Sequence, residues 1–77
     1  MIHIGLDVHK DFSQVEVMDH RGRVLDKGKL HHGDKVGMRE YFESLPQPAT
    51  VTMEATRNWY WLYELVEEYA EVKLAHP

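Results

Sequence analysis

The sequence predicts one small α/β domain with a mixed sheet, in the order strand-strand-strand-helix-strand-helix-strand. Apolar residues alternate with polar ones over residues 2–8 and 13–18, which is typical of strands that bury one face. Over residues 38–45 the apolar spacing changes to that of an amphipathic helix. Alternation returns over residues 49–54, so the second half alternates helices with strands and favours crossover connections. The chain has 77 residues, enough for one domain, which we assign to residues 1–77.

The first half ends in a predicted hairpin and an edge strand. Residues 19–23 form a turn in which Gly22 takes positive φ. Residues 24–30 form a third strand, and their lysines and glycine suit the edge of a sheet. Short connections between three strands predict an antiparallel meander.

Two helices and two further strands are predicted in the second half. Asp34 is the expected N-cap of the first helix, and Pro46-Gln47-Pro48 ends it. Thr56 is the expected cap of the second helix, and residues 72–75 form a last strand. The apolar stripes of the two helices are Met38, Tyr41, Phe42 and Leu45, then Trp59, Leu62, Tyr63 and Val66. The resulting order is that of the ribonuclease-H-like fold.

The second helix also carries apolar residues off its main stripe. Trp61 and Leu65 make its opposite side apolar. Because exposed apolar surface favours association, we expect a homo-oligomer whose interface includes the 59–69 helix.

Composition limits the classes of function. The net charge is −4, so contact with nucleic acid must be local or metal-mediated. The chain has no cysteine, which excludes disulfides, thiolate metal sites and cysteine nucleophiles. Asp7 interrupts the N-terminal apolar residues before a signal peptide or membrane span can form. We therefore expect a cytoplasmic protein with no membrane partner.

Two acids stand out as candidates for chemistry. Asp7 lies among apolar residues of the first strand, and Glu54 ends the fourth. Burying a lone carboxylate is costly unless it is paired or bound to metal. In the predicted fold the two strands are parallel neighbours, so both acids meet at one edge. Carboxylates suit Mg²⁺ or Mn²⁺, and two such ions promote phosphodiester chemistry. A simpler interpretation is that both acids end their strands in water.

Three blocks of sequence resemble the insertion-sequence transposases of the "one-ten" type, in matching order and spacing along essentially the whole chain. The blocks are Ile4-Gly5-Leu6-Asp7-Val8-His9-Lys10, then Met53-Glu54-Ala55-Thr56 with Asn58-Trp59-Tyr60-Trp61, then Leu74-Ala75-His76-Pro77. The resemblance implies a RuvC-like, ribonuclease-H-like domain with four acids in the order Asp, Glu, Asp, Asp. Asp7 matches the first acid and Glu54 the second.

The resemblance also implies what surrounds these two acids. The family's last two acids and a serine nucleophile belong to later segments, so we expect this chain to be an inactive N-terminal part of the transposase. The full protein would recombine DNA with two Mg²⁺ or Mn²⁺ ions and a guide RNA. Arg57 departs from the family, which often has Gly there.

Other residues suggest weaker alternatives. Lys10 and Arg57 are candidate phosphate contacts, although simple solvation, for Lys10 in a hairpin, is the favoured interpretation of both. The six histidines lack a recognised zinc-ligand spacing. Ser13 and Ser44 have no triad context. Four aromatic residues, Trp59, Tyr60, Trp61 and Tyr63, offer base stacking or, more simply, helix packing.

Two other functions remain open. A RuvC-like module can serve only for dimerisation or RNA docking, and intact Asp7 and Glu54 argue mildly against that reading. An actin- or hexokinase-like ATPase also opens with a strand, an acid and a hairpin. Such proteins need small or hydroxyl residues after the acid, whereas this chain has His9-Lys10-Asp11-Phe12.

Overall fold

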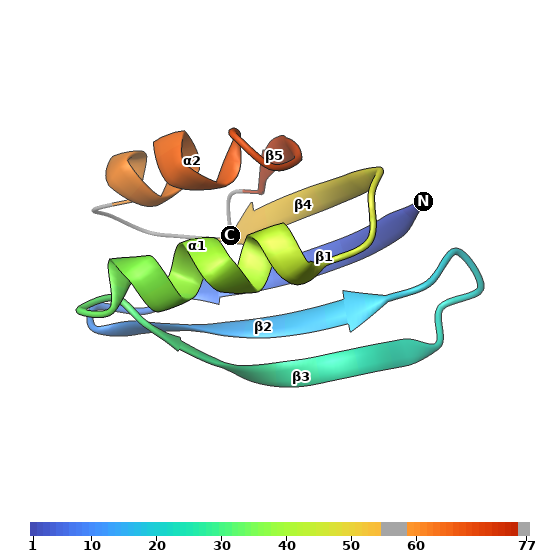
Figure 1. Cartoon of the computed structure of the whole chain (residues 1–77), viewed down its shortest axis with the longest axis horizontal. Helices are drawn as coiled ribbons and strands as arrows, with labels where there is room; N and C mark the ends of the chain where they lie inside the picture. The colour runs from blue at the N-terminus through green and yellow to red at the C-terminus, as the bar shows by residue number, and fades with distance from the viewer. Residues whose placement is uncertain (55–58, 76–77) are drawn as a thin grey trace.

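A computed structural model of the chain describes residues 1–54 and 59–75. These residues form five strands and two helices in the predicted order (Figure 1). The elements are β1 (Ile2–Val8), β2 (Phe12–Met18), β3 (Val24–His31), α1 (Lys35–Ser44), β4 (Ala49–Glu54), α2 (Tyr60–Val66) and β5 (Glu71–Ala75).

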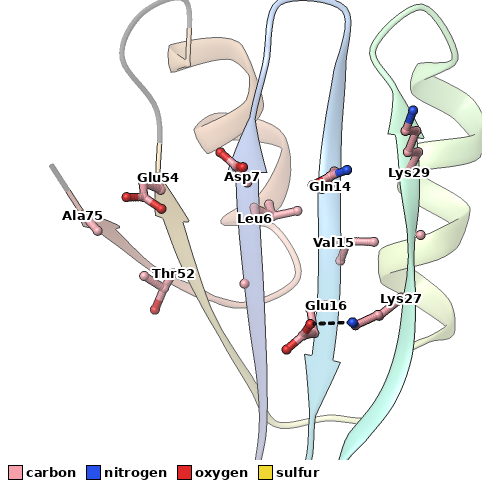
Figure 2. A pocket seen from close by; sticks show the side chains of 12 residues that line it. Leu6, Asp7, Gln14, Val15, Glu16, Lys27, Lys29, Thr52, Glu54 and Ala75 are labelled. Atoms are coloured by element: carbon pink, nitrogen blue, oxygen red, sulfur yellow. Dashed lines mark ion pairs between the residues drawn. The ribbon is translucent and has the colours of Figure 1, made fainter. Parts of the chain in front are cut away.

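The strands form one mixed sheet in the order β3-β2-β1-β4-β5. The first three strands make the predicted antiparallel meander, and β3 is an edge strand as expected. The prediction that β4 lies next to β1 and parallel to it is confirmed, and β5 continues in the same direction. Both helices lie behind the sheet in Figure 2, because the two crossovers run in the same direction across it. One face is thus covered by helices, and the other, the open face, is not.

The core lies between the sheet and the two helices. Alternate residues of the strands point into it, so Val51 and Met53 of β4 are fully buried while Thr52 and Glu54 are exposed. The buried apolar set is Ile2, Ile4, Leu6, Val15, Val17, Leu30, Met38, Phe42, Ala49, Val51, Met53, Leu62, Leu65 and Val66. The period-2 pattern of the sequence therefore separates the covered face from the open one.

The turn between β2 and β3 is held by Asp19. Its carboxylate accepts hydrogen bonds from the backbone N–H groups of Arg21 and Arg23, at 2.8 and 2.9 Å. These bonds lower the pKa of Asp19, with the Arg23 backbone N–H as the largest cause. Gly22 has φ of 83°, which confirms the predicted positive φ.

Helix α1 starts as predicted. Asp34 is its N-cap, and the side chain accepts a hydrogen bond from the Gly37 N–H at 2.9 Å. The carboxylate lies so close that a Cβ on Gly37 would come within 2.2 Å of it. A larger residue at position 37 would therefore require the Asp34 side chain to shift.

Helix α2 differs from its prediction in three respects. Its N-cap is Trp59. The predicted cap, Thr56, lies outside the described residues. The helix ends at Val66, before the predicted end at residue 69. Leu65 is 4% exposed, so the expectation that it lies on an uncovered side is wrong. The buried side of the helix is wide enough to include Leu65 with Leu62 and Val66.

Trp61, on the same helix, is half-buried within the chain itself. It lies edge-on to the His32 ring, with centroids 4.9 Å apart, and under the Lys35 ammonium at 4.4 Å. The apolar exposure that motivated the oligomer prediction is therefore much smaller than the sequence indicated. Within the described residues, no helix is both long and apolar enough to cross a membrane.

Candidate metal centre on the open face of the sheet

Asp7 and Glu54 lie side by side at the ends of neighbouring parallel strands. They are Cα partners in the pairing of β1 with β4. Figure 2 shows both carboxylates on the open face. The structure therefore brings together the two acids that the sequence analysis singled out. The parallel pairing of β1 with β4 makes them neighbours although they lie far apart along the chain.

The environment of Asp7 is open, as in the simpler interpretation that the acids end their strands in water. Its side chain is 56% exposed, because the neighbouring apolar residues point to the opposite face. Asp7 Oδ2 lies 3.2 Å from His9 Nε2. The His9 ring stacks on Phe12, with centroids 4.8 Å apart, and so stays close to the carboxylate.

A row of polar side chains crosses the sheet at the level of the two acids. Asp7 pairs with Gln14 on β2, and Gln14 pairs with Lys29 on β3. The row therefore runs Glu54, Asp7, Gln14, Lys29, with two anions at one end and a cation at the other. Lys29 also lies over the Phe12 ring, at 4.6 Å from its centroid.

A second row forms the floor and far wall of a groove beside the first. In it Gly5 pairs with Thr52 on one side and Glu16 on the other, and Glu16 pairs with Lys27. Glu16 and Lys27 form an ion pair at 3.5 Å. Because Gly5 has no side chain, the open face is hollowed at Gly5. The resulting groove, lined by both rows, has a volume of about 630 Å³.

The donors in this groove suit a divalent cation. Carboxylate oxygens are ligands that Mg²⁺ and Mn²⁺ prefer, and Asp7 and Glu54 present them on neighbouring strands about 4.8 Å apart. Exposed carboxylates on neighbouring strands repel each other only weakly in water, so the pair needs no cation to be stable. Within residues 1–54 and 59–75, no group of three or more His, Cys, Asp or Glu side chains is placed to hold a metal ion.

Gln14 and Lys29 were not selected from the sequence. Both line the groove with Asp7 and Glu54, whereas Lys10 does not and lies exposed in the hairpin before β2. Arg57 lies outside the described residues. The signal for Gln14 was present, because it alternates with buried Ser13 and Val15. The register that places it opposite Asp7 is not visible in the pattern.

Ser13 and His32 form a buried contact that resembles part of a catalytic dyad. Ser13 Oγ lies 2.7 Å from His32 Nε2, and His32 Nδ1 lies 3.1 Å from the carbonyl oxygen of Lys10. Ser13 is 0% exposed and His32 is 8% exposed. A nucleophile must reach its substrate, so we assign this pair a structural role.

Comparisons of the chain with protein-family models and with curated proteins find no match.

Proposed function

We propose that this chain is the N-terminal part of a ribonuclease-H-like, RuvC-like domain of a DNA transposase of the "one-ten" type. The observation that carries the proposal is the pairing of Asp7 with Glu54 on neighbouring parallel strands, with both carboxylates on the open face. The strand order β3-β2-β1-β4-β5 is the one such a domain would have. The three sequence blocks described above add the family resemblance.

In this proposal Asp7 and Glu54 hold Mg²⁺ or Mn²⁺ together with two acids from later segments of the transposase. The bound ions supply Lewis-acid activation of a phosphodiester for attack by the family's serine. The residues of this chain fix the carboxylates on a rigid sheet, because β1 and β4 are both paired on each side. Gln14 and Lys29, in the same row, are placed to contact a phosphate that approaches the acids.

DNA and a guide RNA as partners, and two ions in the full protein, follow from the family resemblance. The proposed homo-oligomer rests on the apolar residues of the 59–69 segment, and the proposed cytoplasmic location on the N-terminal sequence, in which Asp7 interrupts the apolar residues. With only two of four acids, this chain alone would be inactive.

Titration with Mn²⁺ tests the metal pair directly. Two carboxylates bind a divalent cation weakly, so we expect a dissociation constant on the order of millimolar. Paramagnetic broadening of NMR signals should centre on Asp7 and Glu54, and Asp7→Asn should abolish it. Glu16→Gln is the matched control, because it removes an acid from the same groove but from the other row, and it should leave the broadening in place.

Two results would count against the metal pair. Broadening that persists in Asp7→Asn would show that the cation binds elsewhere, and broadening centred on His31 and His32 would indicate a histidine site. Absence of any site at Asp7 in the wild-type chain would favour the reading of a RuvC-like module without metal chemistry.

A further inference from the structure

A second groove lies on the helix side of the sheet, at its outer edge. It runs between α2 and β5 and has a volume of about 460 Å³. β5, marked by Ala75 in Figure 2, is the outermost strand, and within the described residues no strand pairs with its far side. The groove is thus bordered by a row of backbone groups able to accept another strand.

The walls of this groove are apolar and aromatic. Val72 and Leu74 of β5 face α2 and are only half-buried. Tyr63 and the stacked pair Trp59–Tyr60, whose centroids are 4.0 Å apart, form the opposite wall. Tyr60 is 71% exposed, the highest value among the large apolar residues described. Apolar surface beside a strand edge suits alternate side chains of an added strand.

The rim of the groove is acidic. Glu64 and Glu67 line it, and no lysine, arginine or histidine does among the described residues. Both are exposed. An extended occupant with lysine or arginine on the same face as its apolar side chains would pair with these carboxylates, and an occupant with acidic residues there would be repelled.

We propose that this edge binds an extended basic segment of a partner protein, which adds to β5 as a sixth strand. Its apolar side chains would pack against Val72, Leu74 and Tyr63, and basic side chains further along the same face of the added strand would reach Glu64 and Glu67. The surface is separate from the Asp7–Glu54 pair, which lies on the open face. The inference therefore stands without the proposed metal chemistry.

Charge argues against a second copy of this chain as the occupant. Two β5 edges paired about a twofold axis would bring the Glu64 and Glu67 carboxylates of both copies to one interface. The whole chain carries a net charge of −4, which adds to the repulsion. A basic partner removes that repulsion, so the partner segment and not a second copy fits this edge.

Peptide binding to the full chain, followed by NMR, tests the proposal. The probe is a peptide of about ten residues, long enough for one strand, in which every second residue is Val, Phe or Lys, so that apolar and basic side chains share one face, and the residues between are Thr. The control peptide has the same sequence with every Lys replaced by Glu. We expect the basic peptide alone to bind, with shifts confined to β5 and α2. Two further basic peptides carry N-methyl groups on either the odd or the even residues. Only one of these two sets of amides faces β5, so methylation should abolish binding in one peptide and not in the other.

Charge reversal supplies the control on the protein side. The double change Glu64→Lys with Glu67→Lys should weaken binding of the basic peptide about tenfold, the effect expected from losing two exposed ion pairs. The matched change Glu40→Lys with Asp11→Lys alters net charge equally, outside the groove, and should leave binding unchanged. Equal binding of both peptides or of both methylated probes would overturn the proposal, as would sedimentation showing a dimer through β5.

Discussion

Ser13 and His32 are the two polar residues with the least exposure among those described, and they satisfy each other. A buried polar atom that loses its partner carries a desolvation cost of about 1–3 kcal/mol. We therefore expect Ser13→Ala to reduce the free energy of unfolding by about that amount, measured by urea denaturation. This is a large share of the stability of a small domain, about 5 kcal/mol or somewhat more.

Ser44→Ala is the control for that prediction. The Ser44 hydroxyl also donates a hydrogen bond, to the carbonyl oxygen of Tyr41, but it does so at the surface, where water can replace it. The change should alter the free energy of unfolding by less than about 0.5 kcal/mol. Equal effects of the two changes would show that His32 finds another partner.

Asp19 makes stability depend on pH. Because its pKa in the folded chain lies below the ordinary value of 3.8, it stabilises the fold above that value. The contribution is lost as the pH falls through the lowered pKa. Asp19→Asn keeps an oxygen acceptor and removes the charge, so the stability difference between wild type and variant should shrink with acidification.

Chemical denaturation at a series of acidic pH values measures that difference. Arg23→Gln separates the causes, because it removes the guanidinium but keeps the backbone N–H that lowers the pKa most. Most of the pH dependence should survive in Arg23→Gln. A difference between wild type and Asp19→Asn that stays constant with pH would contradict the prediction.

Helix α2 buries a wider set of apolar side chains than its amphipathic pattern indicates. Leu62 and Leu65 are 0% and 4% exposed. Leu65→Ala should therefore reduce the free energy of unfolding by about 2–5 kcal/mol, as in other buried leucine positions. Tyr60→Ser, on the exposed side of the same helix, should change it by about 0.5 kcal/mol or less. Thermal and urea unfolding of both variants decide whether Leu65 belongs to the core.

The strands and α1 could be predicted closely because each depends on a local signal. Ile2, Ile4 and Leu6 alternate with polar residues, and Asp34 marks a helix start. The start of α2 could not, because Trp59 caps it without a side-chain hydrogen bond and leaves no mark in the sequence. The burial of Leu65 depends on the elements that pack around α2, which local patterns do not contain.

The same distinction applies to the candidate site. Asp7 and Glu54 could be paired because parallel neighbours in a sheet place strand ends together. Gln14 and Lys29 were missed because their position depends on the register of β2 against β1 and β3. The exposure of Asp7 agrees with the simpler interpretation that the acids end their strands in water, since apolar neighbours in a strand bury the opposite face and not the acid itself.

The whole molecule has one covered face and one open face. The helices and the apolar halves of the strands enclose a single core, and Asp7, Gln14 and Lys27 lie on the open face with other polar side chains (Figure 2). Contact with a substrate on the open face therefore needs no rearrangement of the core. Stability and surface chemistry are carried by opposite sides of the same strands.

This division predicts how backbone amide hydrogens exchange with solvent. β1 and β4 lie at the centre of the sheet and against the core, so their bonded amides near Ile4 and Val51 should exchange only through global unfolding. β3 is an edge strand whose residues Val24 and Leu25 are 51% and 54% exposed. Its amides bonded to β2 should exchange about 100-fold faster or more, through local opening. NMR-detected exchange on the full chain measures both sets at once. Equal protection of β3 and β1 would mean that another surface covers the β3 edge in solution, and a dependence of that protection on protein concentration would identify it as a second copy.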